Sequence, residues 1–179
     1  MTALPRIMVA PNGARLLPAD HPAVPVTIAQ IVATAGACRA AGADGIHAHV
    51  RDADGAHVLD AGLYRELLAE LAQAEPGFYT QITTEAVGRH TPAEQPALVM
   101  DLRPPAVSIA LREIGAEPEA LPAFFAFCAE AGIDVQHILY DCADILWLGR
   151  LVAAGVVPRG RLAALIVLGR YSPGQVSHP

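Results

Sequence analysis

Short runs of apolar residues alternate along the chain with longer, alanine-rich segments of helical length. The apolar runs carry the β-branched and aromatic residues that are typical of strands. We expect strands at residues 7–10, 45–50, 78–83, 106–110, 133–139 and 162–168. Between them, the pattern predicts helices at residues 27–41, 61–73, from 92 onward, 118–131 and 143–154. Strands that alternate with helices in this way favour a parallel sheet.

Several of these helices have clear end signals. Thr27 and Asp60 stand where N-caps are expected, and Gly42 stands where the first helix should end. The segment Thr91-Pro92-Ala93-Glu94 combines a capping threonine, a proline at the first helical position and a glutamate at the third. These signals fix the order of the elements.

The β–α units are about 30 residues long, and no Gly-x-Gly-x-x-Gly follows the first strand. We therefore expect a barrel rather than an open dinucleotide-binding sheet. A complete (β/α)8 TIM barrel takes about 250 residues, so this chain of 179 residues is interpreted as a single, incomplete barrel domain over residues 1–179 that covers about the first six units. Two bare sheet edges would favour a homo-oligomer.

The second predicted strand, from Gly45 to Val50, carries the clearest candidate chemistry. His47, His49 and Arg51 alternate with apolar residues, so their side chains should share one face. Two imidazoles at this spacing are suited to one zinc ion, and a catalytic zinc site keeps a position open for water or substrate. The alternative is a polar strand end with solvated histidines.

Composition narrows the possible functions. The chain is 53% hydrophobic, with a formal charge of −6 and a mean hydropathy of +0.36. It has no basic stripe for nucleic acid, no apolar run long enough to cross a membrane, and no N-terminal secretion signal. The three cysteines form no Cys-x-x-Cys pair and indicate reduced thiols. We expect a soluble, cytoplasmic protein that binds neither nucleic acid nor membrane.

Active sites of barrel enzymes lie at the carboxyl ends of the strands, and polar residues gather at the predicted ends here. They are Asn12 and Arg15, His47, His49 and Arg51, Gln81, Thr83 and Glu85, Ser108 and Arg112, and Gln136, His137, Tyr140 and Asp141. Each has a simpler explanation alone. Thr83 and Thr84 are also ordinary strand formers, and Arg112 with Glu113 is also a typical surface pair. Their repetition at four strand ends favours a functional site.

These residues resemble the β-keto acid cleavage enzymes, the family that is similar to 3-keto-5-aminohexanoate cleavage enzyme. The resemblance spans essentially the whole chain, and its most specific part is Gly45-Ile46-His47-Ala48-His49-Val50-Arg51-Asp52. It continues through the segments at residues 10–15, 19–27, 81–88, 107–113, 135–141 and 167–169. The resemblance implies a zinc-dependent (β/α)8 barrel that condenses a β-keto acid with acetyl-CoA and yields acetoacetate and a new CoA thioester.

The resemblance also implies roles for individual residues. His47 and His49 correspond to metal ligands, and Thr83 and Ser108 to substrate contacts. We further expect Arg51 and Glu85 to be catalytic, and Asn12, Arg15, Thr84 and Arg112 to bind substrate. A cation at the histidine pair would polarise the keto group and stabilise the negative charge that develops on it.

This sequence departs from the family pattern in two ways. The third metal ligand of the family, a glutamate, and the neighbouring acidic general base lie on a last strand that this sequence does not contain. Glu85 or Asp52 could substitute as a ligand, and two imidazoles alone predict weak metal binding. Arg15 and Ile138 stand where some members carry acids that receive an amino-bearing substrate, so we expect a neutral or anionic substrate.

Two other functions are consistent with parts of the sequence. An amidohydrolase-type metal-dependent hydrolase also uses His-x-His in a barrel, but it needs a lysine, and this chain has none. A truncated, non-catalytic barrel remnant would instead act as an oligomerising or binding module through its open edges. A zinc measurement would distinguish the remnant from the cleavage enzyme.

Overall fold

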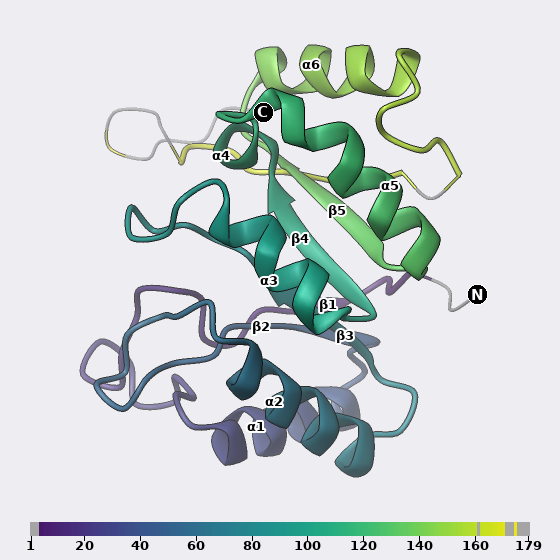
Figure 1. Cartoon of the computed structure of the whole chain (residues 1–179). Coiled ribbons are helices and arrows are strands. Elements are labelled where there is room, and N and C mark those ends of the chain that lie inside the picture. The colour runs from purple at the N-terminus through teal and green to yellow at the C-terminus, as the bar shows by residue number, and fades with distance from the viewer. Residues whose placement is uncertain (1–3, 161, 171–173, 175–179) are drawn as a thin grey trace. The chain divides into compact units, whose positions relative to one another are not determined.

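Strands and helices alternate through the whole described chain, in the order that the sequence predicts (Figure 1). A computed structural model of the protein describes residues 4–160, 162–170 and 174. The chain divides into two units, residues 1–83 and residues 84–179. All the strand pairs within these units are parallel, so the predicted α/β class is confirmed.

The first unit contains three strands and two helices. Strand β1 spans Met8–Val9, β2 spans Gly45–Ala48 and β3 spans Tyr79–Thr83. Met8 pairs with Gly45, and His47 pairs with Gln81, so β2 lies between the other two strands. The helices α1, Ile28–Ala40, and α2, Ala61–Ala74, lie beside each other and pack on β2 and β3 respectively.

Local side-chain hydrogen bonds begin both helices where the sequence predicts. Thr27 and Gln30 form a reciprocal capping box at α1, and the Asp60 carboxylate accepts a hydrogen bond from the Leu63 N–H (2.8 Å). Such caps satisfy backbone N–H groups that the first helical turn leaves without partners, and each contributes about 1 kcal/mol. The predicted caps are confirmed.

The second unit contains the other three strands: β4, Ala106–Ala110, β5, Asp134–Leu139, and β6, Ala163–Ile166. Strand β5 pairs with β4 on one side and with β6 on the other. The helical segments of this unit are α3 (Glu94–Leu102), α4 (Leu111–Ile114), the 3-10 turn η1 (Pro118–Ala120), α5 (Leu121–Ala131) and α6 (Cys142–Ala153).

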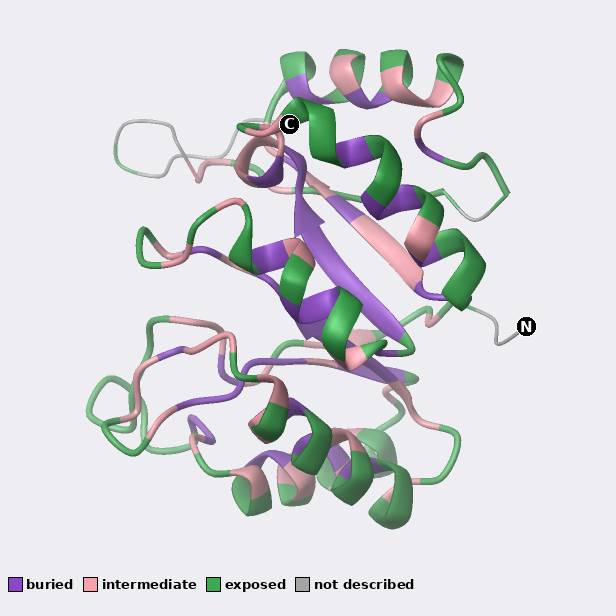
Figure 2. Cartoon of the chain, viewed as in Figure 1, coloured by how far each residue is buried: buried purple, intermediate pink, exposed green. Residues whose placement is uncertain are grey.

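A fully buried strand and one face of α5 form a large part of the core of the second unit. Every residue of β4 is buried, and α5 is buried along one side and exposed along the other (Figure 2). The buried side of α5 carries Phe124 and Phe125, whose rings contact each other edge to face at a centroid distance of 5.2 Å. Burial of two phenylalanine side chains contributes several kcal/mol to stability.

Element boundaries differ from the sequence prediction at several places. Strand β1 has only two residues, α4 was not predicted, and the helix predicted from residue 118 begins as the 3-10 turn η1. Strand β2 ends at Ala48, so His49 and Arg51 lie beyond its ladder. The capping box at Thr91 and Glu94 does form, but regular helix begins only at Glu94. Strand β6 is shorter than predicted, and Leu165 and Ile166 are 43% and 48% exposed.

None of the helices in the described part of the chain has the length and apolar character that crossing a bilayer requires.

His137 lies in the core of the second unit. The sequence placed it with Gln136 among the polar residues at one strand end, but neighbours in a strand point to opposite faces. The His137 ring lies 5.5 Å from the Phe125 ring of α5 and is 2% exposed, so it faces the helix. Burial lowers the pKa of His137 from 6.5 to about 4.

This burial predicts a loss of stability in mild acid. Between the ordinary pKa of histidine and about 4, the unfolded chain binds a proton that the native chain excludes. The free energy of unfolding should therefore fall by roughly 3 kcal/mol from pH 7 to pH 4, in addition to other groups. Urea unfolding at several pH values measures this. His137→Leu should remove that part of the decline, and an unchanged pH profile would contradict the assignment.

Candidate functional site

The two histidines of the His-x-His motif lie close together in the first unit. His47 is the third residue of β2, and His49 follows the end of the strand. Their ring centroids are 4.8 Å apart, and the rings meet edge to face at 82°. His49 is 3% exposed, whereas His47 is half-buried. The predicted pairing of these two side chains is thus present.

Gln81 fixes the orientation of the His47 ring. It lies opposite His47 in the β2–β3 register, and its Oε1 atom is 2.8 Å from His47 Nδ1. An amide oxygen accepts hydrogen bonds, so this contact assigns the proton to Nδ1. In metal sites, such a partner on one ring nitrogen orients the ring and leaves the other nitrogen to bind the ion. The sequence placed Gln81 near Thr83 but gave it no role.

The main chain of His49 is held by the side chain of Asn12. Asn12 Nδ2 donates to the His49 carbonyl (2.7 Å), and the His49 N–H donates to Asn12 Oδ1 (3.3 Å). Asn12 is 2% exposed. The residue predicted to bind substrate therefore lies beside a predicted metal ligand and contacts its backbone.

Arg51, predicted to be catalytic, is buried and donates hydrogen bonds to backbone carbonyls. Its two terminal nitrogens lie 2.6–3.2 Å from five carbonyl oxygens, and the residue is 7% exposed. The acceptors belong to Asn12, Gly13, Ala14, Leu16 and Gly55. Arg51 therefore holds the loop that follows β1.

His57 is a further histidine of this cluster, and the sequence analysis missed it. Its ring centroid lies 5.3 Å from that of His49, and it is 2% exposed. Arg51 and His57 form an isolated antiparallel bridge after the turn at Asp52 and Gly55. The turn sequence Asp52-Ala53-Asp54-Gly55 could have indicated this position, because such a turn reverses the chain and returns it beside the strand end.

The histidine pair fits two positions of a metal site. Two imidazoles that share a zinc ion have ring centroids roughly 5 Å apart, close to the 4.8 Å seen for His47 and His49. Across the described residues, no group of three or more histidine, cysteine, aspartate or glutamate side chains could hold a metal ion. His47 and His49 alone would supply two ligands of such a site, as the sequence predicts.

The remaining predicted residues of the first unit are Arg15 and Thr83. Arg15 is exposed in the loop that Arg51 holds, and Thr83 is buried at the end of β3. The Thr83 carbonyl accepts a hydrogen bond from the Tyr64 hydroxyl of α2 (3.3 Å). That contact fixes the backbone at the strand end. Burial raises the pKa of Tyr64, so its hydroxyl stays protonated as the donor.

In the second unit, the structure brings Thr84 and Ser108 together. Thr84 Oγ1 donates to the Ser108 carbonyl (3.1 Å), and both residues are buried. The Ser108 hydroxyl has no hydrogen-bond partner among the described residues. Glu85, predicted to be catalytic, forms a long ion pair with Arg170 (4.0 Å).

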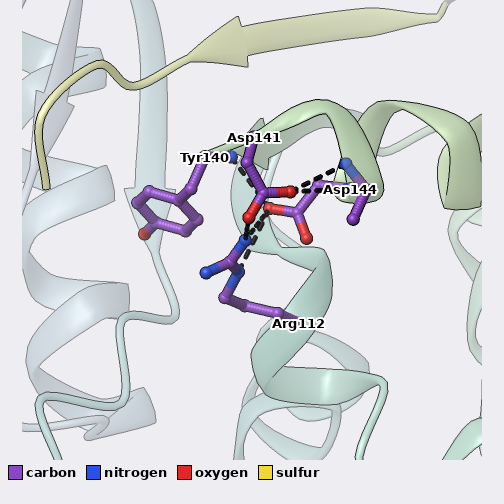
Figure 3. Close-up of polar contacts among 5 residues, drawn as sticks. Arg112, Tyr140, Asp141 and Asp144 are labelled. Atoms are coloured by element: carbon purple, nitrogen blue, oxygen red, sulfur yellow. Dashed lines mark hydrogen bonds and ion pairs between the residues drawn. The ribbon is translucent and has the colours of Figure 1, made fainter. Parts of the chain in front are cut away.

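Arg112 forms a network at the carboxyl ends of β4 and β5 (Figure 3). Its guanidinium contacts Asp144 Oδ2 (2.7 Å) and Asp141 Oδ2 (2.8 Å), and it lies 4.8 Å from the centre of the Tyr140 ring. Asp144 also accepts the Tyr140 N–H (2.8 Å), and Asp141 caps α6. Burial alone would lower the Arg112 pKa, but the hydrogen bonds to both carboxylates outweigh it and raise the pKa.

Asp141 illustrates the electrostatics of this network. The Asp144 N–H, and next the Arg112 guanidinium, lower the pKa of the Asp141 carboxyl group. Its contribution to stability is therefore complete above the ordinary pKa of an aspartate and is lost as the pH falls through the lowered value. The sequence identified Asp141 and Arg112 but not Asp144, whose role depends on the turn between β5 and α6.

The chain is similar to one enzyme family over nearly its whole length. A family model described as beta-keto acid cleavage enzyme matches residues 6–179. The 3-oxoadipate:acetyl-CoA acetyltransferase of Cupriavidus necator is 32% identical over 104 residues, which are 58% of this chain and 36% of that enzyme. The match thus spans little more than a third of that relative.

A solved structure is similar in fold. The crystal structure of 3-dehydroquinate dehydratase from Geobacillus kaustophilus superposes with a TM-score of 0.61, covering 96% of this chain and 65% of that chain. Its sequence identity is 14%. This likeness shows a shared arrangement of strands and helices and carries no information about activity.

The contact between His47 and Gln81 predicts a measurable tautomer. In the wild type, the ¹⁵N shifts of His47 should indicate a proton on Nδ1. Gln81→Leu should give a tautomer mixture, because the ring then loses the oxygen acceptor that selects a proton on Nδ1. Gln81→Glu keeps an oxygen acceptor and serves as the control. Identical shifts in wild type and Gln81→Leu would exclude this role.

The Arg112 network predicts a graded loss of stability. Asp144 is 6% exposed in its side chain and Arg112 is 29% exposed, so Arg112→Met leaves a buried carboxylate without its main partner. We expect about 2 kcal/mol of destabilisation in urea unfolding, less than for a fully buried pair. Arg112→Lys keeps the charge and should lose less. A cost below about 0.5 kcal/mol for Arg112→Met would indicate an ordinary surface pair.

Proposed function

Because this chain belongs to the beta-keto acid cleavage enzyme family, we propose that it acts in the cleavage of a β-keto acid with acetyl-CoA. The proposed products are acetoacetate and a new CoA thioester. The name of the Cupriavidus necator relative, which contains both a 3-oxo acid and acetyl-CoA, supports this reaction class. We further propose that the fold is a part of a (β/α)8 barrel in one domain.

The observation that carries the proposal is the pair of His47 and His49 rings at the end of β2. We assign these residues as two ligands of a divalent cation, and imidazole nitrogens favour zinc. A cation bound there supplies Lewis acidity, which polarises a keto group and stabilises negative charge as a carbon–carbon bond is made or broken. His47 offers Nε2 for this purpose, since Nδ1 contacts Gln81.

Hydroxyl groups are the proposed substrate contacts. Ser108 offers a buried hydroxyl that donates to no described residue, and Thr83 ends β3 with a buried side chain. The Thr84 hydroxyl donates to the Ser108 carbonyl and so helps to position Ser108. Glu85 is the proposed proton-transferring residue. Two carboxylates offset the charge of Arg112, so we propose a structural role for it.

The charge of the loop after β1 favours a neutral or anionic substrate. Arg15 is exposed there, and a cation at this place repels an amino-bearing substrate and attracts a second carboxylate. The relative named for 3-oxoadipate, a dicarboxylate, supports the same preference. The three free cysteines support a cytoplasmic location.

One observation favours a second candidate function. Strand β6 and its flanks expose large apolar side chains, with Leu162, Leu165, Ile166 and Leu168 between 43% and 53% exposed. Clustered apolar exposure of this kind is typical of surfaces that other chains cover. The second candidate is therefore an oligomerising module without catalytic activity.

Metal analysis and an acetoacetate assay test the proposed function. The purified chain should bind about one zinc ion and form acetoacetate from acetyl-CoA with neutral or dicarboxylic β-keto acids, and more slowly with amino-substituted ones. His47→Ala should lose the zinc and lower the rate at least ~100-fold. His21→Ala, at an exposed histidine of the same unit, should change neither.

Two results would contradict the proposal in different ways. Bound zinc without acetoacetate from any member of the panel would exclude the cleavage reaction. No bound zinc in a folded, self-associating wild type, seen by light scattering, would favour the oligomerising module instead.

A further inference from the structure

The backbone ladder between β1 and β2 stops before it reaches the histidine pair. Met8 pairs with Gly45, and Val9 with Ile46, so partners are 37 residues apart in sequence. Two residues past β1, Pro11 has no N–H to donate and interrupts the ladder. The main chain at His49 is nevertheless buried, and buried peptide groups require hydrogen-bond partners.

The side chain of Asn12 continues this ladder. Asn12 and His49 are also 37 residues apart, the same separation as in the β1–β2 pairs. A primary amide carries one carbonyl and N–H donors, as a peptide group does. Asn12 uses both on His49, donating to its carbonyl at 2.7 Å and accepting from its N–H at 3.3 Å. The position of His49 is therefore tied to β1 through a side chain.

Arg51 keeps Asn12 in place. Its guanidinium binds the carbonyls of Asn12 and Gly13 at 3.1 and 2.6 Å, and those of Ala14 and Leu16 further along the loop. Gly13 has a φ of +53°, in the left-handed region that favours glycine. This turn aims successive carbonyls at one cation, so Arg51 holds the loop at several points.

We propose that Asn12 is a positioning residue, which aligns His49 for metal binding from a loop that Arg51 fastens. This inference rests on the proposed function, because it needs His49 to be a metal ligand. It replaces the expectations that Asn12 contacts substrate and that Arg51 takes part in the chemistry. The ring of His57, 5.3 Å from that of His49, packs against the aligned ligand.

Zinc affinity of Asn12 variants of this chain tests the proposal. We expect Asn12→Ala to weaken zinc binding about 10-fold in competition with a chromophoric chelator, by analogy with other outer partners of metal ligands. Asn12→Asp keeps an acceptor for the His49 N–H and loses the donor, so its affinity should be intermediate. Hydrogen exchange at the His49 amide should be faster in Asn12→Ala, with or without zinc.

A control separates alignment from general destabilisation. Thr27→Ala removes the cap of α1 in the same unit and should cost about 1 kcal/mol of stability, but Thr27 does not contact His49. Its zinc affinity should equal that of the wild type. If Thr27→Ala and Asn12→Ala weaken zinc binding equally, the effect is global and the positioning role is wrong.

The remaining outcomes distinguish this inference from the proposed function. A wild type and Asn12→Ala that bind zinc equally tightly would overturn the role of Asn12 alone. Unchanged exchange at the His49 amide in Asn12→Ala would also overturn it, whatever the metal content. A wild type that binds no zinc would contradict the metal site itself, and with it the proposed function.

Discussion

The chain leaves the β-sheet at His49 while it is still buried, and the candidate site depends on how its peptide groups are paired there. Strand β2 ends at Ala48, yet Val50 and Arg51 are 1% and 7% exposed. An unpaired buried peptide group costs about 1–3 kcal/mol. Asn12, Arg51 and the return of the chain at His57 supply hydrogen bonds in place of a ladder. Secondary structure alone would not hold the second histidine.

Arg51 and Arg112, the two arginines at the strand ends, stabilise the structure in different ways. Arg51 is buried and binds carbonyl dipoles, which satisfy its donors and order a loop. Arg112 is partly exposed and binds carboxylates, which neutralise its charge and join α4 to the start of α6. A planar guanidinium suits both tasks because its donors form a fixed fork. In both places, the guanidinium donates to acceptors of the protein itself.

The sequence predicts local features well and side-chain partnerships poorly, for physical reasons. Caps at Thr27 and Asp60 depend on neighbours within four residues, and they formed as expected. The contact between Asn12 and His49 depends on the register of two strands 37 residues apart, which no local pattern specifies. The sequence alone could have shown that His137 and Gln136 do not share a site, because neighbouring residues of a strand point to opposite faces. Asp144 and His57 could not be assigned roles from the sequence, because turns in the chain bring them next to Arg112 and His49.

The loop after β1 also connects the proposed metal site to the proposed preference for anions. Arg51 binds the carbonyls of Ala14 and Leu16, which flank Arg15, and it binds the carbonyl of Asn12. The same cation therefore fixes the residue that aligns His49 and the backbone that presents Arg15. A change that releases these carbonyls should therefore disturb both the proposed metal site and the proposed substrate preference. Arg51 would serve the reaction without contacting the substrate.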